Sequence, residues 1–68
     1  MSKETEFAVF CLENYKTHRK MSGKSVLKLF SDYGVFDYIE DFYDVLHTTG
    51  HNYINNNIDM YLKSRGVF

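Results

Sequence analysis

Glycines follow the apolar stretches of this chain, and no proline interrupts them. Gly34, Gly50 and Gly66 each come after a run in which apolar residues recur every three or four positions. A glycine just past a helix end can adopt the left-handed backbone conformation that closes the helix, and the next residue can then pack back on the last turn. We therefore expect an all-α fold, with positive φ angles at Gly34 and Gly66.

The apolar spacing predicts four helices. In chain order these are about Thr5 to Lys20, Ser22 to Gly34, about Val35 to Thr48, and a last helix that begins between His51 and Asn57 and ends near Gly66. The hydroxyl of Ser22 can accept hydrogen bonds from the exposed amides of its first turn. Asn55 to Asn57 are poor interior helix residues but good caps, so Tyr53 and Ile54 are candidates for extended backbone before the last helix.

A chain of 68 residues allows one domain, residues 1–68. A domain of this size typically buries only about 60% of the surface that its unfolded chain exposes, so its core must be dense. The composition supplies such a core, because 44% of the residues are hydrophobic and 18% are aromatic. We expect a compact four-helix domain with a helix-turn-helix-like central pair.

The single cysteine, Cys11, cannot form a disulfide within the chain or a cysteine-based zinc site. A reducing cytoplasm suits such a chain. The apolar run from Phe7 to Leu12 is too short for a signal peptide or a membrane span. The sequence therefore predicts a cytoplasmic protein with no membrane segment.

The charged residues are sorted along the chain although the net charge is only −1. Five bases and no acid lie from Lys16 to Lys28, a segment called the basic edge below. Six acids and no Lys or Arg lie from Asp32 to Asp59. The simplest interpretation is that bases complement one helix C-terminus while acids line a solvent face. The molecule should then be electrically two-sided.

The predicted third helix combines a narrow acidic stripe with a wide apolar arc. At about 100° per residue, four acids fall on one stripe and the apolar residues cover half of the circumference or more. The stripe consists of Asp37, Glu40, Asp41 and Asp44. Either the other helices wrap this helix, or part of its aromatic arc is left for a partner.

Two histidines, His47 and His51, lie four residues apart around Thr48, Thr49 and Gly50. Gly50 should break the helix between them, so they do not share one helical face as an HExxH metal motif requires. His47 is well placed to contact the last carbonyls of the third helix. We expect structural roles and no metal site, with a partner contact or an acid–base role as the alternatives.

Catalytic motifs are not found. Asp44 and His47 have the spacing of an orienting pair, but no serine or cysteine stands at a recognisable nucleophile turn. Cys11 is buried by pattern, and a buried thiol in apolar surroundings is usually inert. The SGKS segment from Ser22 lacks the earlier glycine and strand of a phosphate-binding loop. The sequence predicts no enzyme, no catalytic residue and no cofactor.

A helix-turn-helix protein that binds nucleic acid is the alternative. Ser22 to Tyr33, then Gly34, then a further helix is the outline of that motif. The acidic stripe on the second helix would repel phosphates, however, and that helix lacks the Arg and Lys that usually read guanine. Contact through the basic edge is the other form of this hypothesis.

Several segments resemble a known bacterial family of short proteins. They are FAVFCLENY, MSGKSVLKLFSDYGVFDYI, YDVLHTTG, and YI with IDMYLKSRG. Together they cover about Phe7 to Gly66 and resemble a domain of unknown function, number thirty-seven ninety-one. Some members are encoded beside toxin-like proteins, so the resemblance implies an antitoxin-like or accessory-subunit role. It supplies no catalytic residue.

These observations favour a small module that binds another protein, such as a neighbouring toxin-like protein, or a second copy of itself. The predicted contact surface combines the acidic stripe with the histidine turn and two tyrosines expected to be exposed. Its residues are Asp37, Tyr38, Glu40, Asp41, Tyr43, Asp44, His47 and His51.

Overall fold

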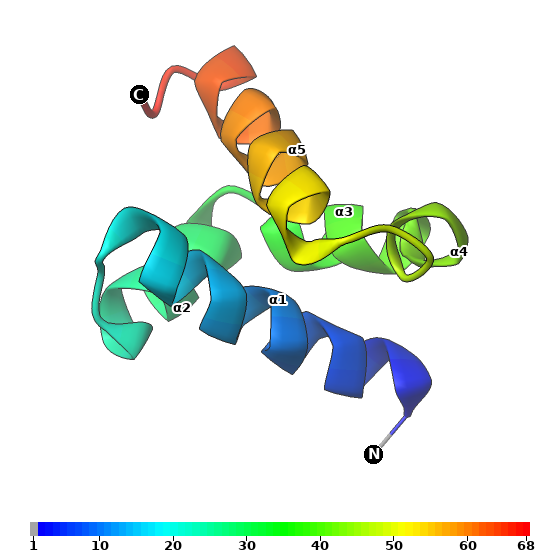
Figure 1. The fold of residues 1–68 in the computed structure, drawn as a ribbon. Coiled ribbons are helices and arrows are strands. Elements are labelled where there is room, and N and C mark those ends of the chain that lie inside the picture. Colours follow the sequence, from blue (N-terminus) through cyan, green and yellow to red (C-terminus); the bar gives the residue numbers. More distant parts are fainter. Residues whose placement is uncertain (1) are drawn as a thin grey trace.

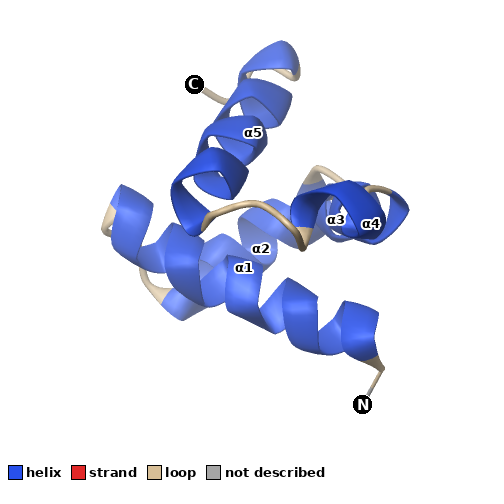
Figure 2. Ribbon diagram, turned by 45° about the vertical axis from the view of Figure 1, so that its right-hand side comes forward, coloured by secondary structure: helices blue, strands red, loops and turns tan. Residues whose placement is uncertain are grey.

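The structure is a computed structural model that describes residues 2–68, and these form five α-helices. The helices are α1 (Lys3–Arg19), α2 (Gly23–Asp32), α3 (Val35–Asp41), α4 (Tyr43–Leu46) and α5 (His51–Ser64). Figure 1 shows α2 and α3 beside α1, with α5 rising from the α1 and α3 layer. Short loops join the helices, and the described residues include no strand (Figure 2). The predicted all-α fold is confirmed.

The core receives residues from all five helices. They are Cys11 and Tyr15 from α1, Val26 and Phe30 from α2, Val35 and Ile39 from α3, Leu46 from α4, and Ile54, Ile58 and Leu62 from α5. Within each of α1, α2, α3 and α5, successive core residues are four positions apart, the spacing that places side chains on one helical face. Burial of Cys11 is as predicted, and it raises the pKa of that thiol to about 12.

Helix α1 begins two residues before the predicted start because Ser2 caps it. The Ser2 hydroxyl accepts a hydrogen bond from the Thr5 amide at 3.1 Å. The helix ends at Arg19, and its C-cap Lys20 is left-handed, with φ of 54° and ψ of 46°. The Met21 amide donates to the Lys16 carbonyl at 3.0 Å across this residue. A lysine thus occupies the position that glycine usually takes at a helix end.

Helix α2 begins as predicted, with the Ser22 hydroxyl accepting from the Ser25 amide at 3.1 Å. The turn after it has a left-handed glycine, Gly34, with φ of 69°. The Tyr61 hydroxyl of α5 contacts this turn, at 2.8 Å from the Tyr33 carbonyl and 3.2 Å from the Gly34 carbonyl. Gly66 also has a positive φ, 78°, so both glycine predictions are confirmed.

The predicted third helix is wrong as one continuous element. It breaks at Phe42, where φ is −108° and ψ is 21°, into α3 and the four-residue α4. No glycine or proline marks this break. Packing separates the two pieces, because Tyr38 contacts Tyr61 of α5 whereas Tyr43 packs edge-on against Phe7 of α1.

Helix α5 begins at His51, within the predicted range, and helical structure is interrupted between His47 and His51 as expected at Gly50. Gly50 is the N-cap of α5, with φ of −76° and ψ of 159°, rather than the residue that closes the preceding helix. The expectation that Tyr53 and Ile54 precede this helix in extended backbone is wrong. Tyr53 and Ile54 are helical, and Asn55 to Asn57 lie inside the helix. Within the helix, the side-chain amide of Asn57 donates a hydrogen bond to the Tyr53 carbonyl at 2.9 Å. The buried Oδ1 of Asn55 accepts no hydrogen bond.

None of the helices in residues 2–68 combines the length and the apolar character that a membrane crossing requires.

The two left-handed glycines should differ in their tolerance of alanine. Gly66→Ala should lower the free energy of unfolding by roughly 1 kcal/mol, the cost of a Cβ in this conformation. Gly34→Ala should cost measurably more, because its added Cβ would lie 3.3 Å from the Tyr61 hydroxyl, whereas nothing lies within 4 Å at Gly66. Urea unfolding of both variants tests this, and equal losses would show that Tyr61 does not constrain the turn.

Lys20→Gly should stabilise the protein, by a few tenths to about 1 kcal/mol, because glycine removes the left-handed penalty at the end of α1. Lys24→Gly is the matched control, since Lys24 is helical and exposed and its replacement should cost up to about 1 kcal/mol. Thermal unfolding should therefore shift in opposite directions. A loss of stability in both variants would contradict the left-handed assignment.

Candidate functional site

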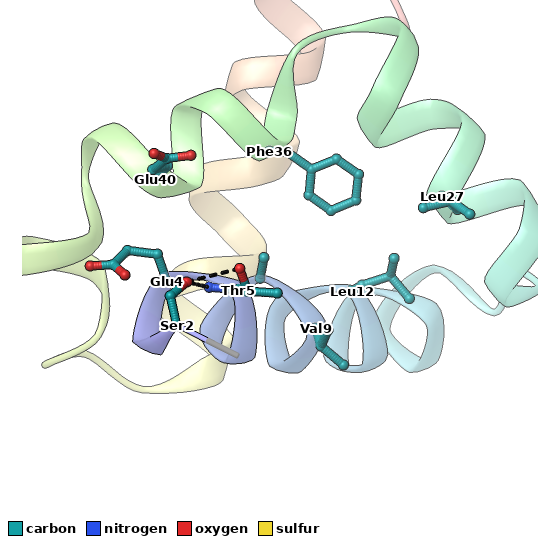
Figure 3. Close-up of a pocket in the computed structure, with 9 residues that line it drawn as sticks. Ser2, Glu4, Thr5, Val9, Leu12, Leu27, Phe36 and Glu40 are labelled. Carbon is teal, nitrogen blue, oxygen red and sulfur yellow. Dashed lines mark hydrogen bonds between the residues drawn. The ribbon is translucent and has the colours of Figure 1, made fainter.

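A groove lies between the N-terminal half of α1 and the α2–α3 pair (Figure 3). Its volume is about 410 Å³. It is lined by the N-cap Ser2, by Glu4, Thr5, Ala8, Val9 and Leu12 of α1, by Leu27 of α2, and by Phe36 and Glu40 of α3. The α1 residues recur at the three- and four-residue spacing of one helical face. We refer to this feature as the groove.

The groove exposes apolar surface because the core uses other faces of its helices. In α2, Val26 and Phe30 point into the core, which leaves Leu27 50% exposed. In α1, Cys11 and Tyr15 are fully buried, which leaves Val9 49% exposed. The ring of Phe36 reaches down from α3 between them (Figure 3). Two half-exposed aliphatic side chains therefore share a concave surface with an aromatic ring.

The two ends of the groove differ in charge. Glu4 and Glu40 lie at one end, and Leu12, Leu27 and Phe36 lie toward the other (Figure 3). Within residues 2–68, neither glutamate takes part in an ion pair. We call Glu4 and Glu40 the acidic end of the groove.

The hydroxyl groups of the lining are already engaged in the helix cap. Ser2 Oγ and Thr5 Oγ1 are 2.9 Å apart and hydrogen-bonded to each other, and Ser2 also caps the Thr5 amide. Small-molecule sites usually direct several free polar groups at their ligand. Here the free polar groups are two carboxylates, so the lining suits an apolar surface with a neighbouring cation.

The predicted acidic stripe only partly meets the groove. Glu40 lines it, whereas Asp37, Asp41 and Asp44 do not, although all three are exposed. The break at Phe42 places Asp44 on α4 and not on the helix that carries Asp37. The stripe as a single partner surface stays a prediction, with Glu40 as its member in the groove.

The two tyrosines predicted to be exposed are partly buried and belong to different clusters. Tyr38 lies 4.6 Å from the Tyr61 ring and 5.1 Å from the Phe42 ring. Tyr43 lies 5.4 Å from the Phe7 ring and stacks on His47 at 4.4 Å. The structure therefore brings Tyr43 and His47 together but separates them from Tyr38.

The histidine turn closes α4 through side-chain donors. His47 Nδ1 donates to the Tyr43 carbonyl at 2.7 Å, which confirms the predicted contact with the last carbonyls. The Thr48 hydroxyl donates to the Val45 carbonyl at 2.9 Å, and the Thr49 hydroxyl donates to the Leu46 carbonyl at 2.8 Å. His51 is exposed at the first position of α5. No cluster of three or more His, Cys, Asp or Glu residues suited to a metal occurs within residues 2–68.

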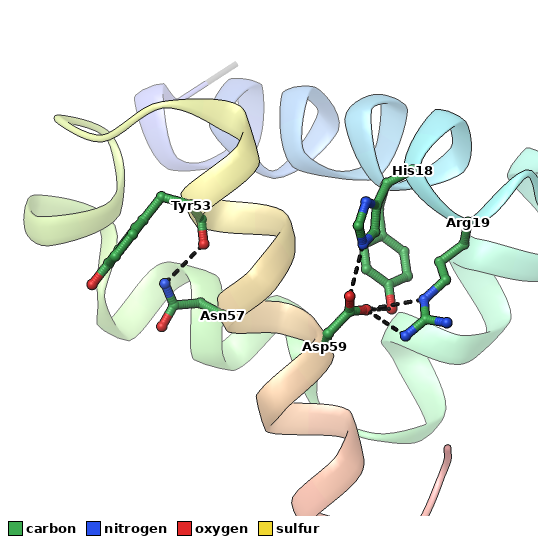
Figure 4. A network of polar contacts seen from close by, with 6 residues as sticks. His18, Arg19, Tyr53, Asn57 and Asp59 are labelled. Carbon is green, nitrogen blue, oxygen red and sulfur yellow. Dashed lines mark hydrogen bonds and ion pairs between the residues drawn. The ribbon is translucent and has the colours of Figure 1, made fainter.

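A polar network that the sequence analysis missed joins α1 to α5 (Figure 4). Asp59 accepts from the Tyr15 hydroxyl at 2.5 Å, from His18 Nε2 at 2.7 Å and from Arg19 Nε at 3.0 Å. The Arg19 guanidinium also lies 3.9 Å from the Phe68 ring centroid. Tyr15, His18 and Arg19 have helical spacing next to the core face, and Asp59 follows the buried Ile58. This spacing and the position of Asp59 beside a core residue were the sequence features that could have indicated the network.

Burial and hydrogen bonding act in opposite directions on Asp59. Burial by itself would raise the pKa of this carboxyl, but donors from His18, Tyr15 and Arg19 and the charge of Arg19 lower the pKa overall. Burial, followed by the hydrogen bond to Asp59, raises the pKa of Tyr15. The side chain of Asp59 is only 16% exposed, whereas those of His18 and Arg19 are each 30% exposed.

The basic edge is partly neutralised within the molecule. Lys16 pairs with Glu13 at 3.0 Å, Lys28 pairs with Asp32 at 2.9 Å, and Arg19 pairs with Asp59 at 2.9 Å. The basic and acidic runs of the sequence thus meet at Asp59 and do not form two fully separate sides. In the part of the chain that the structure describes, Lys20 and Lys24 have no ion pair.

Most of the chain matches a known protein family. The family described as "Protein of unknown function (DUF3791)" matches residues 6–65. The chain belongs to the DUF3791 family. No curated protein and no solved structure matches the chain. Membership of the DUF3791 family confirms the resemblance seen in the sequence.

Asp59→Asn should destabilise this DUF3791 protein by roughly 2 kcal/mol at neutral pH, because charge-assisted hydrogen bonds from three donors are weakened. Because the folded pKa of Asp59 is lowered, its stabilising contribution is present above the unfolded pKa and is lost as pH falls through the folded pKa. The difference between variant and wild type should therefore shrink in acid.

Urea unfolding at several pH values measures this difference. Asp37→Asn, at an exposed acid, is the matched control and should change stability little at any pH. A loss for Asp59→Asn that stays constant down to strongly acidic pH would contradict an ionised Asp59 in the network.

Proposed function

We propose that this protein is a small protein-binding module that docks a partner protein in the groove. The observation that supports this most directly is the pair of half-exposed aliphatic side chains, Val9 and Leu27, on the walls of a concave surface. Apolar patches rimmed by polar residues mark interaction sites in small proteins. Covering the exposed parts of these two side chains would contribute roughly 1 kcal/mol each to a complex.

The groove suits a protein more than a small molecule. Its lining combines two walls of helix surface with few free polar groups, and the Ser2 and Thr5 hydroxyls are occupied by each other. A partner side chain can insert beside Phe36 while its neighbours contact Val9 and Leu27. An antitoxin-like or accessory subunit would use such a surface to hold a larger protein, in line with the role that the family resemblance implies.

The acidic stripe extends this proposal beyond the groove. Glu40 belongs both to the stripe and to the groove lining, and Asp37 and Asp41 are exposed on the same short helix. Charges around an apolar contact mainly steer association and exclude wrong partners. The aspartates therefore act as a polar rim, while the apolar lining provides the contact area.

Quantitative co-purification from the organism that makes the protein tests this function. Proteins that copurify with tagged wild type should be depleted about tenfold with Leu27→Gln. Met60→Gln is the matched control, because Met60 is 69% exposed on α5 and does not line the groove. Both variants should keep their thermal stability, since each residue is at least half exposed.

The proposed function is contradicted if the same proteins are recovered with Leu27→Gln as with wild type. It is also contradicted if gentle purification yields no specific partner with wild type under conditions where the protein is expressed naturally.

A further inference from the structure

We infer that the groove is self-complementary and that two copies of this chain pair through it in a symmetric dimer. This inference goes beyond the proposed function, because it concerns what the protein does with the groove when no other partner is present. The order of charges along one continuous surface and the apolar residues between them support this pairing.

The acidic end supplies the first part of that order. Glu4 and Glu40 lie at one end of the groove and take part in no ion pair within residues 2–68 (Figure 3). Glu4 and Leu12 are eight residues apart on α1, a distance of about 12 Å along the helix axis. Between them, Thr5, Ala8 and Val9 line the groove with side chains that carry no charge.

The opposite end of the surface leads to a cation. Leu27 lines the groove, and Lys24 lies one turn before it on the same face of α2. Lys24 is exposed and has no ion pair among the described residues, whereas its neighbour Lys28 is paired with Asp32. Along the surface, the acidic end is therefore followed by the apolar contact area and then by a base.

A surface with this order complements itself when two copies face each other in opposite directions. In a dimer with a two-fold axis, each patch meets the same patch of the partner, so residue i contacts j and residue j contacts i. With the axis through the apolar middle, Lys24 of each copy approaches the acidic end of the other. The exposed parts of Val9 and Leu27 are then covered on both copies.

A second copy fits this surface better than nucleic acid does. Glu4 and Glu40 would repel phosphates, and Lys24 lies beyond the far end of the groove. The second copy supplies a cation for the acidic end and an aliphatic side chain that can cover the apolar part. Both are already present in the chain as Lys24 and Leu27.

Charge reversal offers a specific test by light scattering after size-exclusion chromatography. Wild type should approach about twice the 8.1 kDa of one chain as its concentration rises. An acid-reversed variant, Glu4→Lys with Glu40→Lys, and a base-reversed variant, Lys24→Glu, should each raise the dimer dissociation constant at least about tenfold. Like charges then face each other at both ends of each homodimer.

Mixing these two variants is the decisive step. Each end of the mixed pair brings opposite charges together, so an equimolar mixture should recover dimers at concentrations where each variant alone is monomeric. Glu6→Lys is the matched control, since Glu6 is an exposed acid of α1 that does not line the groove. It should leave the dimer within about twofold of wild type.

Three outcomes overturn the inference: a wild type that stays monomeric over the whole concentration range, a mixture that stays monomeric, or an equal effect of Glu6→Lys. Circular dichroism of each variant verifies that it is folded, so loss of the dimer is not confused with unfolding. A monomeric wild type that still captures a partner through Leu27 overturns the dimer and leaves the proposed function standing. A dimer that captures no other protein contradicts the proposed function and leaves the dimer inference standing.

Discussion

The arrangement of the helices depends on Tyr15, which is fully buried although it carries a polar hydroxyl. Its ring packs 5.4 Å from that of Phe30, and its hydroxyl donates to Asp59 at 2.5 Å. One side chain thereby links α1 to both α2 and α5. A buried hydroxyl without a partner would cost roughly 1–3 kcal/mol, so Asp59 must stay in place for Tyr15 to be buried. His18 and Arg19 hold that carboxylate from solvent-accessible positions.

This constraint also explains why the groove is open. The C-terminal half of α1 is committed to the core and to Asp59, while α5 covers that half and not the first turns. The N-terminal half has α3, α4 and Leu27 of α2 as neighbours, where Phe7 contacts Tyr43 and Phe36 reaches toward the groove. Among residues 2–68, no helix covers Val9 and Leu27, and both side chains are about half exposed.

Local signals predicted the helix ends better than the helix lengths. The sequence predicted the Ser22 cap and the two left-handed glycines because capping depends on one or two residues and their own backbone. Lys20 shows the limit of that reasoning, since a lysine takes the same left-handed conformation at the end of α1. The sequence did not predict the break at Phe42, because no glycine or proline marks it. The break arises because Tyr38 and Tyr43 pack on different helices. The candidate site was predicted only in part, and Glu40 is the single residue common to the prediction and the groove.

By itself, the sequence determined the all-α class, the family and the positions of most helix ends, because periodicity and capping are properties of neighbouring residues. Only the tertiary structure decided which surfaces remain uncovered and which charges meet. Asp59 lies 40 residues from Arg19 in sequence yet accepts its hydrogen bond, and Glu40 lies beside Glu4 across the groove. Such pairings depend on how the helices cross. Crossing is set by the combined packing of Tyr15, Phe30 and their neighbours, which no single stretch of the sequence contains.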